Sequence, residues 1–180
     1  MYLVLIFVTV ICCIFQLPVI QNTVQWDAQA IISGQWWRIL TGNFGHTNIW
    51  HLAMNLTGLW VISYLFSPTR KQLISTLIGV SSLVGVLLLF SDYRIYLGLS
   101  GTLHGIFGYF ALSEALRGRK SSWLLVLGLL GKVSWELYYG ASITTSSMIA
   151  AKVAVEAHLA GAISGLIGAY CIYAGYKLKK

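Results

Sequence analysis

The feature that most constrains this chain is a series of six apolar segments, each long enough, or nearly so, to cross a lipid bilayer. They run over residues 2–20, 50–66, 73–90, 100–116, 123–139 and 150–176. A helix rises about 1.5 Å per residue, so about 20 residues span the roughly 30 Å of hydrocarbon in a membrane. Charged residues make up only 9% of the chain, far below the usual share in soluble domains. The sequence therefore predicts an all-α, polytopic membrane protein of six transmembrane helices, formed as a single domain over residues 1–180.

The basic residues indicate how these spans are oriented. Eight of the 12 Lys and Arg residues fall on one side of a six-span chain: Arg70, Lys71, Arg117, Arg119, Lys120, Lys177, Lys179 and Lys180. Loops rich in Lys and Arg stay in the cytoplasm, so we expect both termini there and the loops at 21–49, 91–99 and 140–149 outside.

The first segment lacks the flanks of a signal peptide, so we expect a retained span. The net charge of +7 then reflects topology in the lipid bilayer and gives no reason to expect nucleic-acid binding.

Polar side chains occur in three of the spans at matching depth. They are His51 and Asn55 in the second span, Ser100 and His104 in the fourth, and His158 in the sixth. Counted along each helix from the basic residues, Ser100, Asn55 and the two histidines His51 and His158 lie about 23 to 29 Å above that side. Such residues are costly inside a bilayer and usually mark function. We therefore expect a polar site in the outer half of the membrane.

Small residues indicate that the fourth and sixth spans pack closely. Gly101, Gly105 and Gly108 follow one helix face, and Gly161, Gly165 and Gly168 another. Spacings of this kind let helix backbones approach in lipid. By themselves these stripes predict only tight packing. With a serine beside one stripe and a histidine within the other, they also predict that the two side chains meet.

A serine and a histidine in contact suggest nucleophilic catalysis. The Ser100 hydroxyl becomes a useful nucleophile when an imidazole, here His158, takes its proton. The oxyanion that follows needs hydrogen-bond donors. The free backbone N–H of Ser100 at a helix start and the side chains of His51 and Asn55, four residues apart on one helix face, can supply them.

We find no Asp on these spans to complete a catalytic triad. Glu156 lies two residues from His158 and therefore points elsewhere around the helix. We interpret it as the partner of Lys152, four residues earlier. The sequence thus predicts a dyad.

These motifs, in this order along the chain, resemble the rhomboid family of intramembrane serine proteases. They are Trp37-Arg38, His46, His51-x-x-x-Asn55, Gly98-Leu99-Ser100-Gly101 and Ala157-His158-x-x-Gly161-x-x-x-Gly165. The resemblance implies a rhomboid-like bundle with Ser100 and His158 as the catalytic dyad and His51 and Asn55 as oxyanion donors. It also implies site support from Gly98 and Gly101 and a structural role for Trp37, Arg38, His46, Gly161 and Gly165. No cofactor or metal is implied.

One position departs from many bacterial rhomboids, which carry Tyr four residues after the serine, stacked under the catalytic histidine. This chain has His104, and we expect its ring to pack against His158. His104 within Gly-x-Ser-Gly-x-Leu-His-Gly, together with the 180-residue length, resembles the rhombosortase branch. That resemblance implies transmembrane substrates ending in Gly-Gly, an apolar helix and a basic tail. It also implies a bacterial inner-membrane protein whose site opens to the periplasm.

Two other classes of function remain open at this stage. The first is a catalytically silent rhomboid-like protein that binds transmembrane helices, although both dyad residues are present. The second is a haem- or metal-binding membrane protein, since four histidines lie in or near the spans. That reading leaves the serine, the glycines and Asn55 unexplained. Labelling of Ser100 by a fluorophosphonate, or a Soret band in the purified protein, distinguishes these readings.

Overall fold

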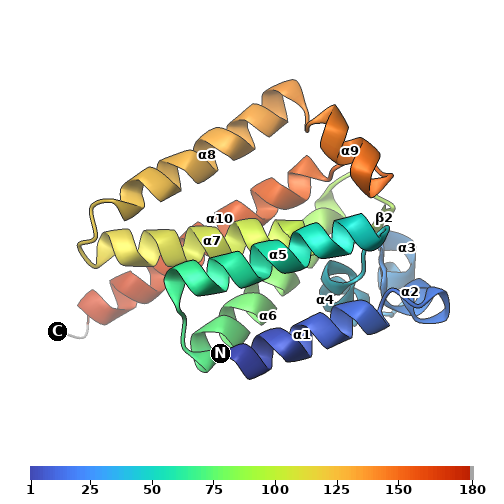
Figure 1. Cartoon of the computed structure of the whole chain (residues 1–180), viewed down its shortest axis with the longest axis horizontal. Coiled ribbons are helices and arrows are strands. Elements are labelled where there is room, and N and C mark those ends of the chain that lie inside the picture. The colour runs from blue at the N-terminus through green and yellow to red at the C-terminus, as the bar shows by residue number, and fades with distance from the viewer. Residues whose placement is uncertain (179–180) are drawn as a thin grey trace.

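Helices form most of this chain in the computed structural model, which describes residues 1–178 (Figure 1). The α-helices of the described residues are α1 (Tyr2–Ile14), α2 (Pro18–Val24), α3 (Ala28–Ile32), α4 (Arg38–Thr41), α5 (Ile49–Phe66), α6 (Arg70–Leu87), α7 (Ser100–Leu116), α8 (Ser122–Tyr139), α9 (Ile143–Ile149) and α10 (Val155–Lys177). The same residues include the short 3₁₀ turns η1 (Gly42–Phe44) and η2 (Leu88–Phe90). The strands β1 (Trp26–Asp27) and β2 (Ile95–Tyr96) pair antiparallel and join the first loop to the segment before α7.

Within residues 1–178, three helical segments are long and apolar enough to cross a membrane by themselves. They are α5, α6 with η2, and α10, and the bent pair α1 and α2 makes a fourth if it counts as one span. The other two predicted spans correspond to α7, which has 17 residues, and to α8, which contains Lys132 and Glu136. The structure therefore provides helices at all six predicted positions, while the count of six membrane crossings stays a prediction.

The first predicted span is wrong at its end. Instead of continuing to Ile20, α1 ends at Ile14, and the chain bends by 105° into α2. Pro18 opens the second helix, because proline lacks a backbone N–H and disfavours helical conformation in the residue before it.

The sixth predicted span is wrong at its start. Residues 143–149 form the separate helix α9, which ends at Ala150 in a left-handed conformation with φ 52°. The main helix α10 begins only at Val155. The five residues between them are a connector and not the first turn of a span.

Glycines bring α7 and α10 into backbone contact, as predicted. A Cβ atom placed on Gly105 would lie 2.6 Å from the carbonyl oxygen of Gly161, and one on Gly101 would lie 2.7 Å from that of Ala157. In return, Cβ atoms on Gly161 and Gly165 would collide with the carbonyl groups of Gly101 and Gly105. No larger residue fits at these positions, so glycine sets the distance between the two helices that carry the predicted dyad.

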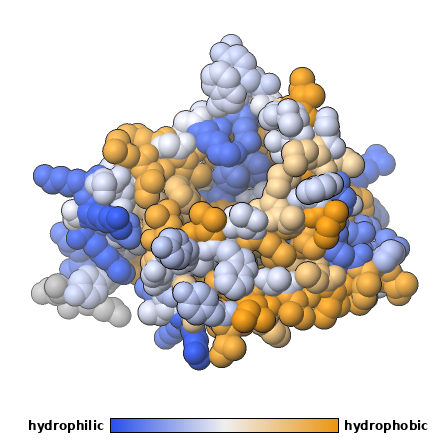
Figure 2. Space-filling view, in the orientation of Figure 1, coloured by the Kyte–Doolittle hydropathy of each residue, from blue (hydrophilic) through white to orange (hydrophobic). Residues whose placement is uncertain are grey.

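The basic helix ends gather at one end of the bundle. In Figure 1 the turn between α5 and α6, the turn between α7 and α8, the end of α10 and the start of α1 all lie toward one end, while α2, α3 and α9 lie at the other. Lys179 and Lys180 fall outside the described residues. Figure 2 shows a broad apolar surface between hydrophilic ends on the visible face. This arrangement agrees with the expected sidedness, which stays a prediction.

Candidate active site

Arg38 organises the first loop. Its side chain is buried, and its nitrogens donate to Gln35 Oε1 at 2.7 Å, to the Gln25 carbonyl at 2.8 Å and to the Asn22 carbonyl at 3.0 Å. Trp37 is half exposed beside it and donates its ring N–H to another carbonyl of the same loop. The pair therefore acts within the loop and does not reach the polar site.

His46 joins this loop to α5. Its ring is fully buried and meets the ring of His51 edge to face, with centroids 5.1 Å apart. Burial, and secondarily the nearby His51, lowers the pKa of His46 to about 3. The ring is therefore neutral at physiological pH and serves as a packing group that supports His51.

The predicted nucleophile and base are in hydrogen-bond contact. Ser100 is the first residue of α7, and His158 lies in the first turn of α10. Ser100 Oγ and His158 Nε2 are 2.9 Å apart, although the two residues are 58 positions apart in the chain. Gly98, just before the serine, has φ +140°, a conformation that side-chain-bearing residues rarely adopt. The sequence therefore places Ser100 at a helix start, with its backbone N–H lacking an intrahelical acceptor.

A cavity of about 390 Å³ opens over this pair, and its lining includes Ser100, His158, His51 and Asn55. Asn55 is buried, and its Nδ2 has no hydrogen-bond partner among the described residues. The His51 ring presents its Nε2 edge toward Gly98, where an added Cβ would lie 2.9 Å away. Thus an unpaired amide donor and an imidazole edge border the same cavity as the serine.

The rings of His104 and His158 stack, with centroids 4.1 Å apart and an angle of 17° between their planes. This is the packing that we expected for His104. Its Nδ1 lies 2.7 Å from the Ser100 carbonyl oxygen, and because a carbonyl only accepts, Nδ1 carries the proton. His104 therefore contacts both members of the Ser100–His158 pair.

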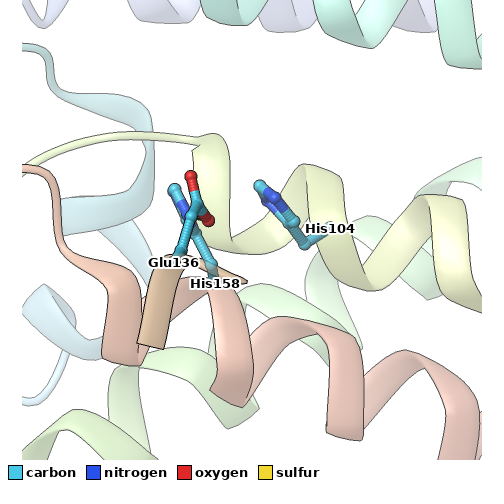
Figure 3. A group of neighbouring side chains, drawn as sticks. All are labelled: His104, Glu136 and His158. Carbon is cyan, nitrogen blue, oxygen red and sulfur yellow. Dashed lines mark hydrogen bonds and ion pairs between the residues drawn. The ribbon is translucent and has the colours of Figure 1, made fainter. Parts of the chain in front are cut away.

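Sequence reasoning missed one residue of this site. Glu136, in the last turns of α8, places Oε2 2.8 Å from His158 Nδ1. In Figure 3 the Glu136 carboxylate overlaps the His158 ring in the view, and His104 lies to the right of them. The spans hold no Asp and Glu156 points away from the histidine, so the third group comes from a helix, α8, that carries no other residue of the predicted site.

The predicted partner of Glu156 was also wrong. Tyr93, in the loop before β2, donates its hydroxyl to Glu156 Oε2 at 2.8 Å. Lys152 lies in the connector before α10, so the helical spacing assumed for the pair does not exist. Burial and the Glu156 carboxylate raise the pKa of Tyr93 above its usual value, so the hydroxyl stays protonated and can donate.

His104, Glu136 and His158 also form a group whose ligand atoms lie within 4.8 Å of one another, close enough to consider a metal ion. A metal needs lone pairs that converge on one point. Here the two imidazoles stack face to face, and both nitrogens of His158 bond other protein groups. The geometry fits a hydrogen-bonded chain better than a coordination sphere.

Comparison with known protein families bears on this geometry. A family model described as Rhomboid domain matches residues 33–175, a range that contains every helix that contributes to the site. Among curated proteins, no match to the chain is found. The family generally comprises intramembrane serine proteases that act on transmembrane substrates, and it includes inactive members. With that match over most of its length, the chain is an integral membrane protein and belongs to the rhomboid family.

Proposed function

We propose that this protein is an active intramembrane serine endopeptidase. The observation that carries the proposal is the 2.9 Å contact between Ser100 Oγ and His158 Nε2 on the wall of a cavity. In the first step His158 accepts the hydroxyl proton while Ser100 Oγ attacks the scissile carbonyl carbon. The tetrahedral intermediate collapses when His158 gives that proton to the leaving amine. A second nucleophile then releases the acyl group from Ser100.

Three groups are proposed to stabilise the oxyanion of that intermediate. The unpartnered Asn55 amide lies in the cavity wall, and leaving such a donor buried and unpaired has a cost unless a ligand uses it. His51 adds a second donor when its Nε2 carries the proton. The backbone N–H of Ser100 is the third. Gly98 and Gly101 support this arrangement because neither position has room for a side chain.

Removing one side-chain donor should slow the reaction without stopping it. We expect Asn55→Ala and His51→Ala each to lower kcat by about 10²- to 10³-fold, since one oxyanion donor is typically worth that much. Cleavage of a transmembrane substrate in proteoliposomes measures the loss, and fluorophosphonate labelling of Ser100 should persist at a reduced rate. Full activity in both variants would show that these side chains only pack.

The proposed topology has six spans, with both termini in the cytoplasm of a bacterial inner membrane and the cavity open to the periplasm. The basic residues of the turns after α5 and α7 and of the end of α10, Arg70, Lys71, Arg117, Arg119, Lys120 and Lys177, lie at the opposite end of the helices from the cavity, which supports this orientation. Lys152 is an exception and lines the cavity. The scissile bond of a substrate must then lie near the outer end of its transmembrane helix.

The proposed substrates are exported proteins held by a C-terminal tail of two glycines, an apolar helix and basic residues. A helix offers no free carbonyl, because its backbone groups are paired within the segment. Cleavage therefore needs a locally unwound stretch, and each glycine reduces helix stability by about 1 kcal/mol relative to alanine. The rhombosortase-like His104, stacked on His158, supports the same substrate class.

Replacing both glycines of such a tail by leucine should block its processing. The measurement is mass spectrometry of the released C-terminus after co-expression, or in vesicles that contain only enzyme and substrate. A substitution in the distant outer domain is the matched control and should leave processing unchanged. Efficient cutting of the Leu-Leu tail would reject this substrate class while leaving the proteolytic activity itself intact.

A further inference from the structure

We propose that Glu136 is a positioning residue that turns the dyad into a Ser100–His158–Glu136 relay. The proposal rests on the proposed function and deepens it. Glu136 does not itself line the cavity and contacts the site through His158, so its action on the reaction passes through that histidine. The three residues come from α7, α10 and α8, and the carboxylate lies within hydrogen-bond distance of the imidazole.

The two hydrogen bonds of His158 have complementary directions. The carboxylate of Glu136, 2.8 Å from Nδ1, can only accept, so the proton of a neutral ring lies on Nδ1. Nε2 then has a free lone pair 2.9 Å from Ser100 Oγ and can accept the hydroxyl proton. The opposite tautomer would place a proton between Nε2 and the serine and prevent proton transfer. Glu136 thus selects the tautomer that the reaction needs, and its negative charge stabilises the imidazolium that forms.

The two carboxylate oxygens of Glu136 have different partners. Lys132, one turn earlier on α8, lies 2.7 Å from Oε1, whereas Oε2 faces His158. Glu136 is mostly buried and Lys132 is half exposed, and the pair supplies the charged residues of a mostly apolar helix. Figure 2 shows a hydrophilic patch over α8 on the visible face. Charged residues in such a segment are costly and are expected where they have a function.

Docking of α8 does not require this carboxylate. Val126, Leu129 and Val133 bury the inner face of α8, and at its first residue Ser122 donates to Glu114 at 2.7 Å. A purely structural role would also be served by an apolar residue, since an ion pair whose lysine is half exposed contributes little to stability. The bond to His158 Nδ1 is the contact that an apolar residue could not replace.

The test compares Glu136→Gln with the wild-type protein in detergent and in proteoliposomes. A glutamine can present an N–H to Nδ1, which would favour the wrong tautomer. We expect kcat to fall by about 10²- to 10⁴-fold, with KM and the thermal unfolding temperature unchanged. Fluorophosphonate labelling of Ser100 should slow in parallel. Glu136→Asp keeps the charge with a shorter reach and should recover part of the rate.

A spectroscopic readout separates tautomer selection from packing. With ¹⁵N-labelled histidine, the His158 signals, assigned by their loss in His158→Ala, should report a proton on Nδ1 in the wild type. In Glu136→Gln that signature should weaken. Unchanged signals together with unchanged kcat would overturn the relay.

Lys132→Met is the matched control, because it removes the ion pair and leaves the bond to His158. It should retain kcat within about tenfold of the wild type, since an ion pair near a surface contributes little. If Lys132→Met and Glu136→Gln lose activity equally and both lower the unfolding temperature, the pair only holds α8 and the relay is wrong. If the wild type is neither labelled at Ser100 nor active, the proposed function fails and the relay with it.

Discussion

Replacing Ser100 or His158 by alanine is expected to abolish cleavage of a transmembrane substrate, while the amount of protein in the membrane stays near that of the wild type. Each variant removes one end of the 2.9 Å contact through which the hydroxyl proton leaves. Groups that act as a unit are not additive, so the double variant should be no slower than either single one. Quantitative immunoblotting of the substrate, with the enzyme level measured in the same membranes, tests both statements.

Ser164→Ala is the matched control for the serine. Ser164 is buried in α10, and within residues 1–178 its hydroxyl donates to the Ala160 carbonyl of its own helix alone, so its loss should leave activity near that of the wild type. Cleavage by purified Ser100→Ala at the wild-type rate would remove the proposed mechanism. A loss in Ser164→Ala as large as in Ser100→Ala would show that the assay reports folding.

Gly161→Val is expected to have the second-largest effect, although it changes no polar atom. Its side chain would collide with the carbonyl group of Gly101, and overfilled packing typically costs about 1–3 kcal/mol. The α7 and α10 helices would have to separate, which would lengthen the contact between Ser100 and His158. We expect at least a hundredfold loss of cleavage and a lower thermal unfolding temperature in detergent.

The matched control is Gly175→Val on the same helix, where nothing lies within 4 Å of an added Cβ. It should keep both activity and unfolding temperature near wild-type values. An active, stable Gly161→Val protein would show that the close approach of the helices is not needed for the site.

The sequence allowed the α7–α10 contact to be predicted, because glycine spacing and helical depth are local properties that can be counted along the chain. The break after α1 was not predicted, because residues 2–20 were expected as one span, although Pro18 inside that segment is a signal that favours a break. No comparable sequence signal predicts the break at Ala150, because residues 141–160 contain neither Gly nor Pro. There the tertiary structure, with α9 bonded to the start of α5 through Thr47 and Asn48, sets the end of the helix.

The contact of Glu136 with His158 was not predicted, for a different reason. On a helix, Lys132 and Glu136 are an ordinary i,i+4 pair and satisfy one another. Counting depth from Ser122, the first residue of α8, places Glu136 about 21 Å along the helix, near the layer of His158 and Ser100. This depth alone would have made Glu136 a candidate for the site. Which side of α8 faces His158 depends on how the helices pack, and the local sequence does not state this.

The most direct test of the central claim is mass spectrometry of the purified protein after reaction with a fluorophosphonate. A serine protease with an intact site should take up one adduct, located on Ser100 by peptide mapping, with none in His158→Ala over the same time. The result that would contradict the account is a wild-type protein that cleaves a transmembrane substrate while Ser100 stays unmodified, or one that carries its adduct on another residue.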